Sequence, residues 1–371
     1  MSFDPEKLVN PKLLQVKPYQ PGKPIAECQR ELGLTHFIKM ASNENPLGTS
    51  ELVKSQLAKE LVHLSVYPDG NGFELKTALS KHHQVKFSEI ILGNGSEDVI
   101  KMAIQTFVWG QGELLIFEYA FGAYKILAEG LGFTVKEVPS QQYGMDLAAM
   151  MSGVTANTKL IIFANPNNPT GSYINHADFV SFMNKLNQDV MVLCDEAYYE
   201  YMVEKDYPQT LTLLKQYPNL IITRTFSKAN GLAGLRVGYA IADERVIDLM
   251  NHVRQPFNVN HLAQVAALMA LQDQDFVKQV IRLNEQGKTQ FADGLKKLNL
   301  SFLPCHGNFF TVEIPIEGIN VFEAMLKQGI IIRPLMPYRM KNYYRITIGT
   351  FEQNEACLNA LKKILHKERV V

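Results

Sequence analysis

A lysine at position 228 lies among side chains that can bind phosphate. Two hydroxyl residues, Thr225 and Ser227, and two arginines, Arg224 and Arg236, flank it. A lysine amine can form a Schiff base with a carbonyl group, while hydroxyl and guanidinium groups can hold an anion. Taken alone, the lysine could equally be a solvated surface charge. With those neighbours, the segment predicts a site for a carbonyl cofactor that carries a phosphate.

Further polar residues stand where strand-like runs end. An apolar run of strand length that stops abruptly at a polar residue is typical of a buried parallel strand with a functional group at its carboxyl end. We therefore expect an Asn, an Asp, a Tyr and the lysine to meet in one site. The runs and their polar ends are Lys159–Ala164 before Asn165–Gly171, Val190–Cys194 before Asp195, and Leu220–Thr225 before Lys228.

Four motifs occur in one order along the chain: Asn168-Pro-Thr-Gly, Asp195-Glu-Ala-Tyr, Ser227-Lys-Ala and Gly234-x-Arg-x-Gly. This combination resembles pyridoxal-phosphate enzymes of the aspartate-aminotransferase fold type. The resemblance is closer to the histidinol-phosphate aminotransferases, class-II pyridoxal-phosphate-dependent aminotransferases. Further segments that carry it are Tyr19–Pro24, Ala41–Gly48, Tyr67–Asp69, Gly93–Asp98, Gln255–Asn260, Ile330–Pro334 and Tyr344–Thr350.

The fold class that follows is α/β. From about residue 44 to 270, apolar strand-length runs alternate with helical stretches, which predicts a mostly parallel central sheet covered by helices. Apolar residues at roughly helical spacing predict one long helix over Asp275–Leu298. The resemblance implies pyridoxal-phosphate-dependent transferase fold type I. We expect an N-terminal arm (1–43) that packs on the small domain and the partner subunit, a large domain (44–275) and a smaller α/β C-terminal domain (276–371).

The resemblance also implies roles around the cofactor ring. Lys228 would hold the cofactor aldehyde and later move a proton, and both tasks need an amine that can be neutral near pH 7. Asp195 would face the ring nitrogen and keep it protonated. Asn168 and Tyr198 would donate hydrogen bonds to the ring's 3-oxygen. Phe121 would stack on the ring, although Tyr119-Ala-Phe121 replaces the Pro-Thr-aromatic sequence of most relatives.

The phosphate of the cofactor would bind at several places. Ser96 and Glu97 begin a predicted helix, whose N-terminal N–H groups favour anions. By resemblance, Ser227 and Arg236 are phosphate ligands, with Thr225 beside them. Tyr67 would reach the phosphate of the neighbouring subunit's cofactor, which implies a homodimer.

The substrate would be bound by Arg345, helped by Arg333, by Asn43 and by Tyr19 of the partner subunit. The resemblance implies a transaminase that interconverts histidinol phosphate plus 2-oxoglutarate and imidazole-acetol phosphate plus glutamate, a step of histidine biosynthesis. An arginine accepts a phosphate or a carboxylate equally well. Two alternatives therefore stay open: an aromatic amino acid aminotransferase, with Phe257 and Phe309 around the substrate ring, and a pyridoxal-phosphate-dependent decarboxylase of a phosphorylated amino acid.

Bulk properties exclude other classes of protein. The 371 residues carry no net charge, so no overall field favours nucleic acid or an anionic membrane. No signal peptide and no membrane span are expected. Four scattered cysteines form no Cys-x-x-Cys pair, which predicts free thiols and a cytoplasmic location. The arm lacks a helix-turn-helix pattern, so a DNA-binding module on this fold ranks last. No metal site is expected.

Overall fold

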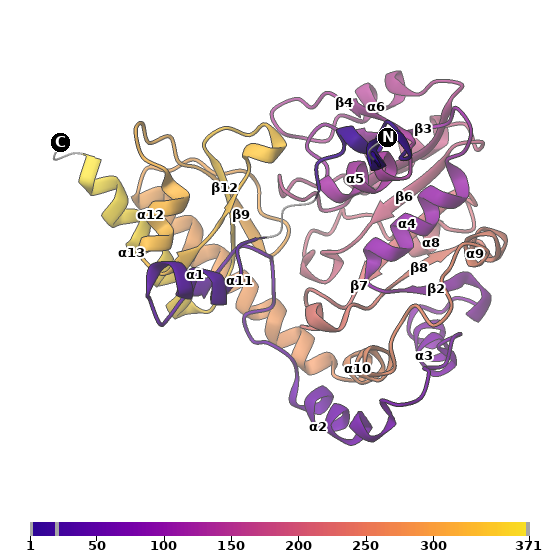
Figure 1. The fold of residues 1–371 in the computed structure, drawn as a ribbon, viewed down its shortest axis with the longest axis horizontal. Coiled ribbons are helices and arrows are strands. Elements are labelled where there is room, and N and C mark those ends of the chain that lie inside the picture. The colour runs from indigo at the N-terminus through magenta and orange to yellow at the C-terminus, as the bar shows by residue number, and fades with distance from the viewer. Residues whose placement is uncertain (1–2, 19–21, 369–371) are drawn as a thin grey trace.

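A seven-stranded sheet forms the centre of the large domain in the computed structural model, which describes residues 3–18 and 22–368 (Figure 1). The strand order is β2-β8-β7-β6-β5-β3-β4. Of these strands, β8 runs antiparallel to both neighbours and the other pairs are parallel, so the prediction of a mostly parallel sheet is confirmed. The strands are β2 (Ile90–Gly93), β3 (Glu113–Phe117), β4 (Thr134–Val138), β5 (Thr158–Ala164), β6 (Met191–Asp195), β7 (Leu220–Thr225) and β8 (Gly238–Ala242).

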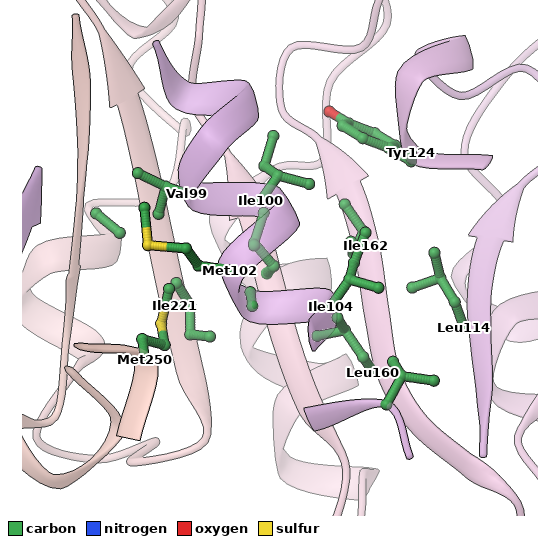
Figure 2. Close-up of a cluster of buried hydrophobic side chains, with 14 of the residues drawn as sticks. Val99, Ile100, Met102, Ile104, Leu114, Tyr124, Leu160, Ile162, Ile221 and Met250 are labelled. Atoms are coloured by element: carbon green, nitrogen blue, oxygen red, sulfur yellow. The ribbon is translucent and has the colours of Figure 1, made fainter. Parts of the chain in front are cut away.

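The central strands are apolar on both faces because helices cover both. Figure 2 shows α4 (Ser96–Phe107) laying Ile100 and Ile104 close to Ile162 of β5, within one core cluster. On the opposite face, Phe179 and Phe182 of α7 pack in a second cluster with the alternate residues of the same strands. Successive side chains of a strand point to opposite faces of the sheet. A strand that helices cover on both faces therefore has a continuous apolar sequence.

Helices alternate with the strands in the chain order that the sequence predicts. Those of the large domain are α2 (Glu51–Glu60), α3 (Phe73–His83), α4, α5 (Gly122–Gly130), α6 (Leu147–Gly153), α7 (His176–Lys185), α8 (Thr210–Leu213), α9 (Glu244–Asn251) and α10 (His261–Gln272).

The small domain is built on a three-stranded antiparallel sheet of order β11-β12-β9. The long helix expected at Asp275–Leu298 is α11 (Gln274–Lys297), which runs from the large domain into the small one (Figure 1). Phe291 and Leu295 of α11 pack there against Phe310 and Ile346 of the sheet. The remaining elements are β9 (Phe309–Glu313), α12 (Val321–Lys327), β10 (Ile330–Ile331), β11 (Arg333–Pro334), β12 (Tyr343–Thr347) and α13 (Phe351–Glu368).

The N-terminal arm contacts both domains. Its helix α1 (Ile25–Leu32) ends at Gly33, whose φ of 67° suits a glycine at a helix C-terminus. Strand β1 (Ile38–Lys39) pairs in parallel with β10. Nearer the start of the chain, the Lys12 Nζ donates to the Gly132 carbonyl at 3.0 Å on the large domain. The arm thus places residues 41–45 between the two domains.

The four cysteines are free thiols, as predicted. In residues 3–18 and 22–368, no helix combines the length and the apolar character that crossing a membrane requires.

Candidate active site

The polar ends of three parallel strands meet at one cavity. Strands β5, β6 and β7 run in parallel, with Ala164 opposite Asp195 and Asp195 opposite Thr223. Their carboxyl ends therefore lie at the same edge of the sheet, where ligands bind in open α/β sheets. The cavity at this edge has a volume of ≈ 190 Å³. On this measure a single water needs only about 10–15 Å³, so the space is of ligand size.

Lys228 lines this cavity and lies three residues after the end of β7. Its Nζ donates a hydrogen bond to the Ser42 carbonyl at 3.1 Å. Burial, followed by the charge of Arg345, lowers the pKa of Lys228 to about 8. A larger share of neutral amine is therefore present near neutral pH than for an ordinary lysine, as a nucleophile and general base requires.

Asp195 is 4% exposed and ends β6. The Tyr124 hydroxyl donates to its Oδ2 at 2.6 Å, and the Thr223 hydroxyl donates to its Oδ1 at 2.9 Å. Burial raises the pKa of Asp195, whereas these two hydrogen bonds act in the opposite direction. The carboxyl group lines the cavity, where it can face a positively charged ring nitrogen.

Tyr198 belongs to a hydrogen-bond network that crosses between the domains. The Asn43 side-chain amide donates to the Tyr198 hydroxyl at 2.8 Å, and the Asn43 backbone N–H donates to the Thr347 hydroxyl at 2.9 Å. The Asn308 amide donates to the Asn43 carbonyl at 3.1 Å. Burial raises the pKa of Tyr198 to about 12, so its phenol stays protonated. Its proton is therefore available to an acceptor in the cavity.

Asn168 sits in a loop that other asparagines hold in place. The Asn165 side chain donates to the Ile174 carbonyl at 3.1 Å and accepts from the Ile174 N–H at 2.8 Å. The Asn167 amide donates to the Tyr119 carbonyl at 2.9 Å. Asn168 itself accepts a hydrogen bond at its Oδ1 from Arg345, which leaves its amide as a donor.

Several residues that line the cavity are suited to a phosphate. Ser96 and Glu97 line it and begin α4, and the N–H groups at a helix N-terminus favour anions. The Ser227 N–H bonds the Thr225 hydroxyl at 3.1 Å, which fixes both hydroxyl residues beside the lysine. Arg236 has a φ of 59° and joins the same wall.

Arg224 does not reach the cavity, although the sequence offered it as a second possible phosphate ligand. Side chains alternate along β7, so Arg224 points away from the face on which Thr225 lies. Its Nη2 forms a buried ion pair with Glu196 at 2.8 Å, and its guanidinium stacks on Tyr199 at 3.6 Å. Arg236 is therefore the flanking arginine that lines the cavity and remains the candidate phosphate ligand.

Two arginines of the small domain also line the cavity. Arg333 and Arg345 are direct cross-strand partners in β11 and β12, and both line the cavity. The Arg345 Nη1 donates to the Asn168 Oδ1 at 2.6 Å, and its Nη2 donates to the Ala41 carbonyl at 2.8 Å. Its Nε is buried and has no hydrogen-bond partner among the described residues. A buried charged donor without a partner is costly, and a bound anion would satisfy it.

Most of the residues singled out from the sequence line this one cavity. Tyr67 does not: its side chain is 80% exposed and stacks on Phe257, with 4.6 Å between ring centroids. Tyr19 lies outside the described residues. His306 is not among the residues that line the cavity, and its Nδ1 lies 3.5 Å from a carboxylate oxygen of Glu204. Of the residues singled out from the sequence, those that line the cavity are Asn43, Ser96, Glu97, Phe121, Asn168, Asp195, Tyr198, Thr225, Ser227, Lys228, Arg236, Arg333 and Arg345.

Sequence reasoning missed two of the side chains nearest to Asp195. Tyr124 lies three residues after Phe121, and residues at this spacing share a helix face. That spacing could have placed Tyr124 beside the cavity, but not its partnership with Asp195. Thr223 lies two residues before Thr225 on β7, hence on the same face, and could have been found in the same way.

The groups around the cavity fit pyridoxal phosphate. A lysine amine with a lowered pKa suits the aldehyde, and a buried carboxyl group suits the ring nitrogen. At the phosphate end, a Cβ on Gly95 would come within 2.6 Å of the Arg236 Nη2. Glycine at this position therefore leaves room for the guanidinium next to the start of α4.

Comparisons with known proteins agree with this geometry. Residues 35–361 match the family described as aminotransferase class I and II. The chain is 43% identical over 362 residues to histidinol-phosphate aminotransferase 1 of Idiomarina loihiensis, covering 98% of this chain and 99% of the relative.

Solved structures show the same fold. The histidinol-phosphate aminotransferase of Sinorhizobium meliloti, in complex with pyridoxal-5'-phosphate, superposes with a TM-score of 0.86 at 25% identity, covering 96% of this chain and 97% of that one. The aspartate aminotransferase of Thermus thermophilus with maleate gives a TM-score of 0.82 at 20% identity, covering 96% and 99%. The predicted fold type is confirmed. The chain belongs to the class I and II aminotransferases, which use pyridoxal phosphate, and within them to the histidinol-phosphate aminotransferase family.

Proposed function

We propose that this aminotransferase interconverts histidinol phosphate plus 2-oxoglutarate and imidazole-acetol phosphate plus glutamate. The observation that carries this substrate choice is the pair Arg333 and Arg345, which lie opposite each other and line the cavity that holds Lys228. A guanidinium group binds a phosphate through two parallel charge-assisted hydrogen bonds, and two such groups on one wall of the cavity can bind several phosphate oxygens.

Bound pyridoxal phosphate supplies an aldehyde that exchanges amines and a ring that accepts the electron pair released at the substrate's α-carbon. Lys228 is the base that would take the proton from that carbon and hold it for the amine exchange. Its position beside the cavity and its lowered pKa suit both tasks. Asp195 would hold the ring nitrogen, while Tyr198 and the Asn168 amide would donate to the ring's 3-oxygen. Phe121 would stack on the ring.

The phosphate of the cofactor would be held by the N–H groups at Ser96 and Glu97, by Thr225 and Ser227, and by Arg236. In the substrate, the guanidinium of Arg345 grips the phosphate of histidinol phosphate or a carboxylate of glutamate. Asn168 and the Ala41 carbonyl orient that guanidinium. Asn43 supports the site by holding Tyr198.

The active unit that we propose is a homodimer in the cytoplasm. Apolar side chains between residues 61 and 73 are unusually exposed: Val62 is 77%, Leu64 63% and Val66 65% exposed. A second copy of the chain would cover this surface. Tyr67, 80% exposed in the same stretch, would then reach the other subunit's cofactor phosphate, and Tyr19 would reach its substrate.

The proposed domain limits are 1–43 for the arm, 44–275 for the large domain and 276–371 for the small domain. The start of α11 at Gln274 supports the second limit. Pairing of β1 with β10 supports an arm that packs on the small domain.

A half-reaction without an acceptor tests the function. Holoenzyme is mixed separately with histidinol phosphate, glutamate or L-phenylalanine, and the cofactor spectrum is followed to the pyridoxamine form. We expect histidinol phosphate and glutamate to drive the change, and L-phenylalanine to act at least 100-fold more slowly. A fast change with L-phenylalanine alone would assign an aromatic aminotransferase. Carbon dioxide release would assign a decarboxylase.

A further inference from the structure

Both oxygens of the Asp195 carboxyl group already receive a hydroxyl donor from the protein. Tyr124 donates to Oδ2 at 2.6 Å and Thr223 donates to Oδ1 at 2.9 Å. Asp195 is 4% exposed, and the other two side chains are fully buried. Within the part of the chain that the structure describes, no lysine or arginine forms an ion pair with this carboxyl group.

Neutral donors have a specific effect on a buried carboxyl group. Burial favours its protonated form, and hydrogen bonds to its charged form oppose this. A lysine or arginine would also stabilise the charge, but it would compete with any cation that binds opposite. Hydroxyl groups are neutral, so they do not compete with the protonated ring nitrogen of the cofactor for the carboxylate. Burial raises the pKa of Tyr124 well above its ordinary value, so its phenol remains a donor at every working pH.

The position of Tyr124 is fixed by its surroundings. It lies in the first turn of α5 and at the edge of the core cluster formed by α4 and the sheet (Figure 2). Its ring meets that of Phe121 edge to face, with 5.6 Å between centroids. Phe121 lines the cavity. Tyr124 therefore contacts both the Phe121 ring, which we propose stacks on the cofactor, and the carboxyl group of Asp195. Thr223 stands directly opposite Asp195 in the sheet register.

We propose that Tyr124 is a positioning residue which, with Thr223 as second donor, keeps Asp195 an oriented carboxylate and so keeps the proton on the cofactor's ring nitrogen. This rests on the proposed role of Asp195. Without the Tyr124 hydroxyl, the shared proton moves from the ring nitrogen toward Asp195. The ring then accepts electrons less well, although attachment to Lys228 is unaffected.

The test compares Tyr124→Phe with Tyr217→Phe, a control that also removes a buried phenol. Tyr217 is 5% exposed and donates to Asn184 at 2.8 Å, outside the cavity. The probe is 4′-deoxypyridoxine 5′-phosphate with ¹⁵N in its ring, which lacks an aldehyde and binds without Lys228 chemistry. The ¹⁵N chemical shift distinguishes a pyridinium from a neutral pyridine. We expect a pyridinium in the unchanged protein and in Tyr217→Phe, and a shift toward pyridine in Tyr124→Phe.

The half-reaction with glutamate should slow in Tyr124→Phe by roughly 10- to 100-fold, because the variant loses one hydrogen bond to a charged group and such a bond contributes a factor of this size. A full pyridinium signal in Tyr124→Phe would overturn the proposal and leave Asp195 in its role. A neutral pyridine in the unchanged protein would instead overturn the role of Asp195. Thr223→Val removes the other donor with little change of shape. If Tyr124→Phe does not fold, a pyridinium signal in Thr223→Val overturns the proposal.

Discussion

Replacing Arg345 by lysine keeps the positive charge but removes the planar guanidinium group, whose N–H donors point in fixed directions. In the guanidinium group, Nη1 donates to Asn168 at 2.6 Å and Nη2 donates to the Ala41 carbonyl at 2.8 Å. The buried Nε has no partner among the described residues and can donate to an anion. A lysine has one nitrogen and cannot make these contacts together. The variant therefore loses about one charge-assisted hydrogen bond to the substrate anion, worth roughly 1.5–3 kcal/mol. This corresponds to a loss of about 10- to 150-fold in kcat/KM.

The assay is the half-reaction rate at low substrate concentration, measured with histidinol phosphate and with glutamate. We expect similar losses for both substrates, because one guanidinium serves both anions, and an unchanged affinity for pyridoxal phosphate. Arg339→Lys is the matched control. Arg339 lies on the surface, 59% exposed, and pairs with Glu137 at 2.8 Å. A loss below threefold with both substrates, or a loss confined to one of them, would refute the reasoning.

Four further outcomes are expected. Lys228→Ala should bind pyridoxal phosphate without forming a borohydride-reducible adduct, and a reduced adduct seen by mass spectrometry would contradict the lysine assignment. Because the folded pKa of Lys228 is about 8 and its ordinary value 10.5, the unfolded chain binds more protons between these pH values. The cofactor-free protein should therefore gain stability from about pH 8 to 10.5, and urea unfolding should show this gain reduced in Lys228→Met. Arg224→Met leaves the buried Glu196 charge unpaired and should lower the free energy of unfolding by about 3–5 kcal/mol, with partial recovery in the double variant with Glu196→Gln. Val62→Asp with Leu64→Asp should give monomers in sedimentation runs, whereas Phe351→Asp, at a residue also exposed (63%), should not; dimers in the first variant would exclude this surface as the interface.

The sequence could predict the site wherever function follows a strand end. Asn168, Asp195 and Lys228 each come shortly after an apolar run, and parallel strands bring such ends together whatever lies between them in the chain. The long helix α11 was predictable for a related reason, because its apolar spacing extends over the whole segment.

Other parts of the site depend on contacts that no local pattern encodes. Tyr124 and Asp195 are 71 residues apart, and their hydrogen bond exists only because α5 and β6 meet at one edge of the sheet. Arg224 and Arg236 look equivalent along the chain. Strand alternation sends Arg224 to Glu196, whereas Arg236 reaches the cavity from a left-handed backbone conformation. The Ser42 carbonyl that holds Lys228 comes from a distant segment with no side-chain signature.

Helix α11 contributes side chains to two separate hydrophobic clusters. Val277 and Val280 pack in the cluster that contains Tyr198, whereas Phe291 and Leu295 lie in the core of the small domain. At 1.5 Å per residue, its 24 residues make a rod of about 36 Å. If the rod tilts by a few degrees about its first turns, its far end travels about 3 Å. Because Phe291 and Leu295 pack against the sheet of the small domain, such a tilt would also displace Arg333 and Arg345, which line the cavity from that sheet.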